Sequence, residues 1–140
     1  MKILITGSAG FIGFHLSKRL LEKKYQVYGL DNINNYYDTS LKKKRISLLK
    51  KLSTKKFKFI KLDLQNKNKL NELFVKYKFD IVINLAAQAG VRYSIENPKI
   101  YLQNNIDTFL NLLECCRKQS IKHLIYASTS SVYGLDSLMP

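Results

Sequence analysis

The chain has 140 residues, 46% of them hydrophobic, and this length predicts one domain or part of one. Its 24 Lys and Arg outnumber its 10 Asp and Glu, and the formal net charge of +14 raises the hypothesis of nucleic-acid binding. It contains no window of about 18 apolar residues and no signal-peptide pattern, so we expect no transmembrane helix, no membrane partner and a cytoplasmic location.

The basic residues do not accompany any recognised nucleic-acid motif. Ten of them lie between Lys42 and Lys61, and the chain is also rich in Asn and Ile, a mixture typical of a compositional bias of the source genome. We therefore expect lysines on solvated faces and no nucleic-acid partner. The adjacent Cys115 and Cys116 would point about 100° apart on a helix, which predicts buried packing in a reducing compartment. Two cysteines and two distant histidines are too few for a metal site, so none is expected.

The stretch from Gly7 to Gly13, GSAGFIG, follows a short apolar run over residues 2–6 and precedes a segment with helical spacing over residues 11–24. A strand, a glycine turn and a helix in this order are typical of a site for the pyrophosphate of a dinucleotide. The glycines let the backbone come close, and the free N–H groups at the helix start face the negative charge. The first two glycines are one residue further apart than in the common G-x-G-x-x-G form. For the glycines alone, an ordinary turn is the alternative.

A second predicted strand, residues 26–31, ends at Asp31. A carboxylate about 20 residues after the glycines is placed to bind the hydroxyls of an adenosine ribose, and it repels a 2′-phosphate, so we expect NAD rather than NADP. An aspartate that only forms the turn is the alternative. The polar and aromatic residues 32–39 are expected as a loop, and Ser40 is expected to cap a basic helix over residues 41–51.

The rest of the chain continues the alternation of strands and helices. Further strands are predicted at 57–62, 80–85 and 123–127, and further helices at 67–77 and 98–118, with Pro98 in the first turn of the last helix. Small residues at 86–90 are expected as a flexible connection, and residues 128–134 as a hydroxyl-rich loop. Such alternation gives right-handed crossovers and a parallel sheet. We predict a Rossmann-type, doubly wound α/β fold with strand order 3-2-1-4-5 and a ligand site beyond the C-terminal strand ends.

Five of these loops together resemble the nucleotide-sugar epimerase/dehydratase family, a branch of the extended short-chain dehydrogenases/reductases. The resemblance covers essentially the whole chain and rests on residues 7–13, 31–32, 63–64, 84–92 and 126–134. Within the family, residues 31–38, 89–94 and 133–135 are most similar to the UDP-glucuronate 4-epimerases. The resemblance implies NAD as cofactor, a UDP-sugar as substrate and a homodimeric parent enzyme.

The resemblance also implies a role for each matching residue. It assigns the NAD pyrophosphate to Gly7, Gly10, Phe11, Ile12 and Gly13, and the adenosine ribose to Asp31, Asn32 and Asn35. It assigns the adenine to Asp63 and Leu64. The path to the nicotinamide ribose is assigned to Leu85, Ala86, Ala87 and Gln88, with Asn104 near the cofactor. Thr129 matches the residue that hydrogen-bonds the sugar 4-hydroxyl, and Ser130 and Ser131 would face the sugar. Arg92 would attract the sugar carboxylate or a phosphate, and a solvated loop charge is its alternative.

The chain departs from the family at two points. Thr108 stands where family members often have a glycine, which questions the local packing of its helix. In the family the catalytic base is a Tyr followed four residues later by Lys, whose charge lowers the pKa of the phenol. None of the nine tyrosines here has Lys at that spacing. We therefore expect residues 1–140 to be the NAD-binding part of a longer enzyme and to be inactive alone. The chain is expected to be truncated before a sixth strand, which would leave the strand over 123–127 as an open edge of the sheet.

Three functions stay open at this point. The first is a UDP-sugar 4-epimerase that acts by transient oxidation at C4. The second is a dehydratase or dehydrogenase of the same family, but dehydratases carry an acidic pair where this chain has Ser130 and Ser131. The third is a non-catalytic nucleotide-binding or interaction protein, whose binding through its basic face would survive mutation of the glycine loop.

Overall fold

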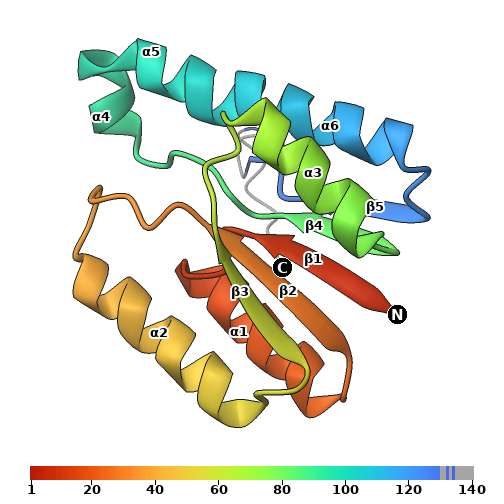
Figure 1. The fold of residues 1–140 in the computed structure, drawn as a ribbon. Helices are drawn as coiled ribbons and strands as arrows, with labels where there is room; N and C mark the ends of the chain where they lie inside the picture. The colour runs from red at the N-terminus through yellow and green to blue at the C-terminus, as the bar shows by residue number, and fades with distance from the viewer. Residues whose placement is uncertain (130–131, 133, 135–140) are drawn as a thin grey trace.

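The computed structural model describes residues 1–129, 132 and 134. Its strands are β1 (Lys2–Thr6), β2 (Gln26–Asp31), β3 (Phe57–Lys61), β4 (Ile81–Asn84) and β5 (His123–Tyr126). Its helices are α1 (Phe11–Glu22), α2 (Thr39–Leu52), α3 (Lys67–Tyr77), α4 (Val91–Glu96), α5 (Pro98–Tyr101), the π-helical segment η1 (Leu102–Asp107) and α6 (Thr108–Lys118). All strand pairs are parallel, in the order β3-β2-β1-β4-β5 (Figure 1). The predicted fold and strand order are confirmed.

The sheet is covered on both faces, with α1 and α2 on one side and α3 and α6 on the other (Figure 1). Alternate residues of a strand point to opposite faces, so Ile3 and Ile5 pack with Leu49 of α2, while Leu4 packs with Phe74 of α3. The central strand β1 is in register with β2 and β4 on its two sides. The sheet therefore lies between two separate hydrophobic layers, and it carries the loops at its C-terminal edge.

Helix α2 differs in detail from its prediction. Its N-cap is Asp38 rather than Ser40: the Asp38 carboxylate accepts hydrogen bonds from the backbone N–H of Ser40 at 2.8 Å and from its hydroxyl at 2.7 Å. These hydrogen bonds lower the pKa of Asp38 because they stabilise the charged form. The helix buries Lys42, Ile46 and Leu49, and it leaves Leu41 exposed. The spacing 42, 46, 49 is the stripe that faces the sheet, so a lysine occupies a core-facing position.

The segment from residue 91 to residue 118 also differs from its prediction. Instead of one helix from Pro98, it contains α4, α5, the π-helical η1 and α6. Helix α4, which was not predicted, contains Arg92, for which a solvated loop charge was the alternative. It follows Gly90, which has a positive φ of 105°. The hydroxyl of Thr108, the first residue of α6, donates to the carbonyl of Asn104 in η1 at 2.6 Å. Single π turns are frequent at functional sites, which directs attention to Asn104 and its neighbours.

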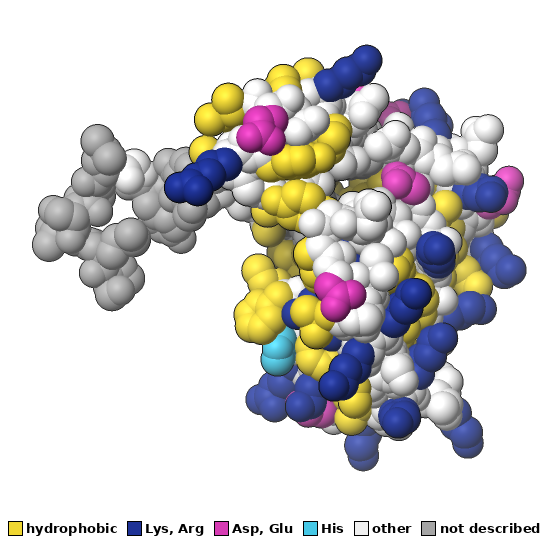
Figure 2. Space-filling model, turned by 90° about the vertical axis from the view of Figure 1, so that its left-hand side faces the viewer, with side chains coloured by type: hydrophobic (Ala, Val, Ile, Leu, Met, Phe, Trp, Pro, Cys, Tyr) yellow, Lys and Arg dark blue, Asp and Glu magenta, His cyan; other side chains and the backbone are white. Residues whose placement is uncertain are grey.

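Strand β5 lies at one edge of the described sheet, next to β4. Its Ile125 and Tyr126 are 43% and 57% exposed, in line with the open edge expected for this strand. Figure 2 shows many Lys and Arg side chains over the half of the molecule that carries α1 and α2, among only scattered Asp and Glu. Among the described residues, no helix combines the length and the apolar character needed to cross a bilayer.

The two cysteines are buried on α6, as predicted, and Cys115 donates its S–H to Asn71 Oδ1 at 3.1 Å. Burial raises the pKa of both thiols, that of Cys116 to about 12. At pH 8 we therefore expect the native chain to react with a thiol-specific disulfide reagent far more slowly than the chain in urea. Rapid labelling of the native chain would contradict this burial.

The same shift sets the pH dependence of folding. A thiol in the unfolded chain loses its proton near pH 8.5, roughly, whereas folded Cys116 keeps its proton until a much higher pH. The stability that Cys116 contributes is thus present below the unfolded pKa and is lost as the pH rises toward 12. Urea unfolding between pH 8 and 10, compared with Cys116→Ala, measures this loss.

Candidate cofactor-binding site

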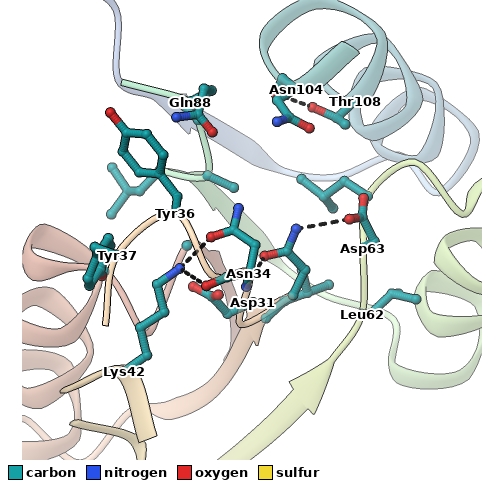
Figure 3. Close-up of a pocket in the computed structure, with 18 residues that line it drawn as sticks. Asp31, Asn34, Tyr36, Tyr37, Lys42, Leu62, Asp63, Gln88, Asn104 and Thr108 are labelled. Carbon is teal, nitrogen blue, oxygen red and sulfur yellow. Dashed lines mark hydrogen bonds between the residues drawn. The ribbon is translucent and has the colours of Figure 1, made fainter. Parts of the chain in front are cut away.

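A pocket of about 140 Å³ lies beyond the C-terminal strand ends, at the position that the strand order predicts (Figure 3). Its walls come from the loops after β1, β2, β3 and β4 and from η1 with the start of α6. The residues predicted to bind the cofactor that line it are Gly7, Gly10, Asp31, Asn32, Asp63, Leu64, Leu85, Ala86, Ala87, Gln88 and Asn104. The lining also includes Leu30, Asn34, Tyr36, Tyr37, Lys42, Leu62 and Thr108.

The glycine loop is packed too closely for side chains at two of its positions. Gly7 has a left-handed φ of 67°, and a Cβ there would lie 2.8 Å from the backbone of Leu85 and Ala86. A Cβ on Gly13 would overlap the carbonyl of Gly7, so α1 sits directly on the loop. Gly10 is the N-cap of α1 and offers no side-chain cap. The first N–H groups of a helix lack intrahelical acceptors, and here they start beside the pocket and suit an anion.

Phe11 and Ile12 contribute to this helix start through their backbone rather than through their side chains. Their side chains are 67% and 64% exposed and do not line the pocket. Gly13 is buried one turn into α1. At these three positions the start of α1 therefore offers backbone N–H groups rather than side chains to an anion.

Asp31 lies at the end of β2 and is buried at the base of the pocket. Its Oδ2 accepts the backbone N–H of Ala9 at 3.1 Å, and its Oδ1 accepts that of Ile33 at 2.9 Å. The carboxylate thus joins the glycine loop to the end of β2. Each carboxylate oxygen can accept a further hydrogen bond, so the group can also bind the hydroxyls of a ribose.

Lys42 is a pocket residue that sequence reasoning missed. Its side chain is 5% exposed, and Nζ donates to the Asn34 carbonyl at 2.9 Å and to Asn34 Oδ1 at 2.6 Å. Nζ also lies 4.4 Å from the centre of the Tyr37 ring. Burial lowers the pKa of Lys42, and the negative charge of Asp31 opposes that shift. The helical spacing of Lys42 with Ile46 was the signal that could have placed it inside.

The polar residues beside Asp31 orient one another. Asn32 Nδ2 donates to Asp63 Oδ2 at 2.9 Å, and the backbone N–H of Gln65 donates to Asp63 Oδ1 at 2.9 Å. Asn34 rather than Asn35 lines the pocket, and Asn35 is exposed. Leucines from β2 and from the loop after β3 line the wall between these groups. An apolar slot with amide and carboxylate groups at its rim suits a flat polar base.

The loop after β4 forms one wall of the pocket, and side chains from β1 and η1 hold it through hydrogen bonds to its backbone. The N–H groups of Leu85 and Ala86 both donate to Thr6 Oγ1 at 3.1 Å. Asn105 fixes Gln88 from both sides: its Oδ1 accepts the Gln88 N–H at 2.7 Å, and its Nδ2 donates to the Gln88 carbonyl at 3.0 Å. Asn105 has no distinguishing sequence signal, because its role depends on the π turn. The expected flexible connection is therefore a firmly attached loop.

Of the residues predicted to meet the sugar, the two that the structure describes do not line this pocket. Thr129 is exposed after β5, Arg92 is exposed on α4, and neither lines the pocket. Ser130 and Ser131 lie outside the described residues. Thr108, the departure from the family pattern, is buried and lines the pocket, so its packing is resolved by its hydrogen bond to the Asn104 carbonyl. Within the described ranges, no three His, Cys, Asp or Glu side chains gather as a metal site.

The sequence is related to proteins of known family. Protein CapI of Staphylococcus aureus is 53% identical over 140 residues, and the probable UDP-glucuronate 4-epimerase of Rhizobium meliloti is 43% identical over 140 residues. Both matches cover all of this chain but only 41% and 40% of the relatives. The chain thus spans about two fifths of the length of these relatives.

The fold is shared with solved epimerase structures. The UDP-glucuronic acid 4-epimerase of Bacillus cereus, solved in complex with UDP-glucuronic acid and NAD, is 42% identical and has a TM-score of 0.84. That match covers 98% of this chain and 43% of the other. Residues 4–140 match the family described as GDP-mannose 4,6 dehydratase. The chain therefore belongs to the NAD-dependent epimerase/dehydratase family that its loops resemble.

Proposed function

We propose that the pocket binds NAD, with the buried carboxylate of Asp31 as the observation that carries this proposal. The described residues fit this cofactor at each end. The tight loop at Gly7 and the open helix start after Gly10 suit the pyrophosphate, and Asp31 suits the ribose diol. The slot beside Asp63 suits the adenine. A 2′-phosphate at the ribose would meet the Asp31 charge, so NAD is favoured over NADP.

We further propose that the chain is the cofactor-binding part of a nucleotide-sugar 4-epimerase of the UDP-glucuronate to UDP-galacturonate type. The names of the relatives support this reaction, and so does Ser130-Ser131 in place of the acidic pair of dehydratases. Bound NAD would take up the hydride from C4 of the sugar and return it to the other face. Thr129 would orient the 4-hydroxyl, and Ser130, Ser131 and Arg92 would bind the sugar. The Tyr–Lys pair would come from residues outside 1–140.

The parent enzyme is proposed to be a homodimer that uses the outer face of η1 and α6. Leu102, Ile106 and Leu110 follow one another at intervals of four residues and are 55%, 58% and 57% exposed. An apolar stripe that water reaches on one helix is typical of a subunit interface.

Two measurements test the proposed function. Calorimetric titration of the 140-residue chain with NAD is expected to show binding at one site. A chimera of residues 1–140 with the uncovered part of the Rhizobium meliloti relative is expected to interconvert UDP-glucuronate and UDP-galacturonate, whereas the 140-residue chain alone is not. A folded chain that does not bind NAD overturns the cofactor site. Turnover by the chain alone overturns the placement of the catalytic base outside it.

A further inference from the structure

The carbonyl oxygen of Ala89 accepts hydrogen bonds from three side chains. Tyr101 Oη donates at 2.8 Å, Tyr36 Oη at 2.9 Å and Gln88 Nε2 at 3.3 Å. Gln88 is a neighbour in the chain, and Tyr101 belongs to α5 of the same layer. Tyr36 comes from the other side of the pocket, from the loop between β2 and α2. Two loops that are 53 residues apart in sequence are thus joined at one oxygen.

The two loops are attached to the body of the protein in different ways. The β4–α4 loop (residues 85–90) is fixed at Gln88 by the side chain of Asn105. It is also fixed by the Tyr101 hydroxyl, which is hydrogen-bonded to the carbonyls of Ala89 and Gly90. The β2–α2 loop (residues 32–38) is attached beside the glycine loop, because Arg45 Nη1 donates at 3.1 Å both to Tyr37 Oη and to the Ala9 carbonyl. Within the described residues, the hydrogen bond from the Tyr36 hydroxyl to the Ala89 carbonyl is the one side-chain hydrogen bond between these two loops.

The backbone of the β4–α4 loop leaves space for this hydroxyl. A Cβ on Gly90 would lie 2.5 Å from Tyr36 Oη and 3.5 Å from Tyr101 Oη. The Tyr36 ring also contacts the Tyr93 ring, with centroids 5.4 Å apart. Figure 3 shows the Tyr36 ring beside Gln88, at the pocket. A side chain at position 90 would therefore require the Tyr36 hydroxyl to shift from its place beside Ala89.

The hydrogen bond between Tyr36 and Ala89 is of a kind that can break and form again in the folded protein. Tyr36 is 45% exposed, and water can replace a hydrogen bond at such a site at small net cost. The β2–α2 loop that it fastens carries Asn34, which lines the pocket and holds Lys42. When the Tyr36 bond opens, the β2–α2 loop loses its hydrogen bond to the opposite wall of the pocket, so the part of the loop around Tyr36 can move away from that wall.

We propose that Tyr36 is a positioning residue whose hydroxyl fastens the β2–α2 loop to Ala89 and so closes that loop over the adenosine end of the bound dinucleotide. The proposal rests on the proposed NAD site. A dinucleotide enters and leaves when the Tyr36 bond is open. The bond therefore slows both association and dissociation, whereas a simple contact with the cofactor would slow dissociation alone.

Tyr36→Phe tests this inference, because it removes the hydroxyl and keeps the ring. In stopped-flow fluorescence with NADH, we expect both the association and the dissociation rate constants to rise, each about two- to tenfold. Gly90→Ala, which retains Tyr36 but occupies the space of its hydroxyl, is expected to shift both rate constants in the same direction. Tyr93→Phe is the matched control, since among the described residues its hydroxyl makes no side-chain hydrogen bond. A rise in the dissociation rate constant alone overturns the proposal.

Amide hydrogen exchange of the ligand-free chain provides a readout that does not depend on NADH. We expect exchange in residues 32–38 to be faster in Tyr36→Phe than in the wild type and unchanged in Tyr93→Phe. Unchanged exchange in Tyr36→Phe overturns the proposed fastening. A wild-type chain that does not bind NADH overturns the proposed function, and the exchange measurement still decides whether Tyr36 fastens the loop.

Discussion

Replacing Gly13 by alanine is expected to lower the affinity for NAD by about 100-fold or more, close to 2.8 kcal/mol. An added methyl group would overlap the carbonyl of Gly7 and lie 2.8 Å from its carbonyl carbon, so either α1 or the glycine loop must move. Alanine favours a helix over glycine by about 1 kcal/mol, but a clash with backbone atoms that cannot rotate away costs about 1–3 kcal/mol. The loss of the close approach to the pyrophosphate follows from the displaced loop.

Calorimetric titration with NAD measures this loss, and urea unfolding shows whether the variant folds. Gly10→Ala is the matched control, because a Cβ at Gly10 meets only the Gly7 carbonyl oxygen at 3.1 Å and its backbone is ordinary. We expect Gly10→Ala to change the free energy of unfolding less than Gly13→Ala does. If Gly13→Ala were to fold and bind NAD as tightly as the wild type, the glycine loop would not be the pyrophosphate site.

Asp31→Asn is expected to remove the preference for NAD over NADP and to weaken NAD binding by about 30-fold or more, roughly 2 kcal/mol. The substitution keeps the size of the side chain, but it removes the charge that repels a 2′-phosphate and one acceptor for the ribose diol. It also places an NH₂ group opposite the N–H of Ala9 or that of Ile33, each of which now donates to the carboxylate. One of the two hydrogen bonds must be lost, which costs about 1–3 kcal/mol of stability.

Parallel titrations with NAD and NADP measure the preference of each variant. Asp63→Asn is the matched control, since Asp63 is a second carboxylate in the pocket and accepts hydrogen bonds from Asn32 and Gln65. We expect Asp63→Asn to weaken NAD binding with little change in the ratio of the two affinities. An unchanged ratio in Asp31→Asn would show that Asp31 does not face the 2′ position.

The parts of the fold that were predictable are those where local pattern and tertiary packing agree. The strands over 2–6 and 26–31 and the helix over 67–77 have the predicted bounds, because their apolar residues follow one period throughout. The strand order and the position of the pocket followed from the alternation of elements. The position of Asp31 at the pocket was predictable because the predicted strand over 26–31 ends at this residue, at the C-terminal edge of the sheet.

The parts that were missed depend on geometry that the pattern does not contain. Lys42 counts as a surface residue in any scale of polarity, yet its stem occupies the core stripe of α2 while its ammonium group reaches Asn34. Helix α4 has six residues, too few to show a period. Asn105 reaches Gln88 from the π turn of η1, and no residue type specifies a π turn.

The shared use of β1 by both hydrophobic layers has a mechanical consequence. Ile3 and Ile5 belong to the layer of α1 and α2, whereas Leu4 between them belongs to the layer of α3 and α6. If either layer unfolds, one face of β1 becomes exposed to water, so the two layers are expected to unfold as one cooperative unit. The two walls of the pocket stand on opposite layers, so the five-stranded sheet sets the spacing of the elements from which both walls extend.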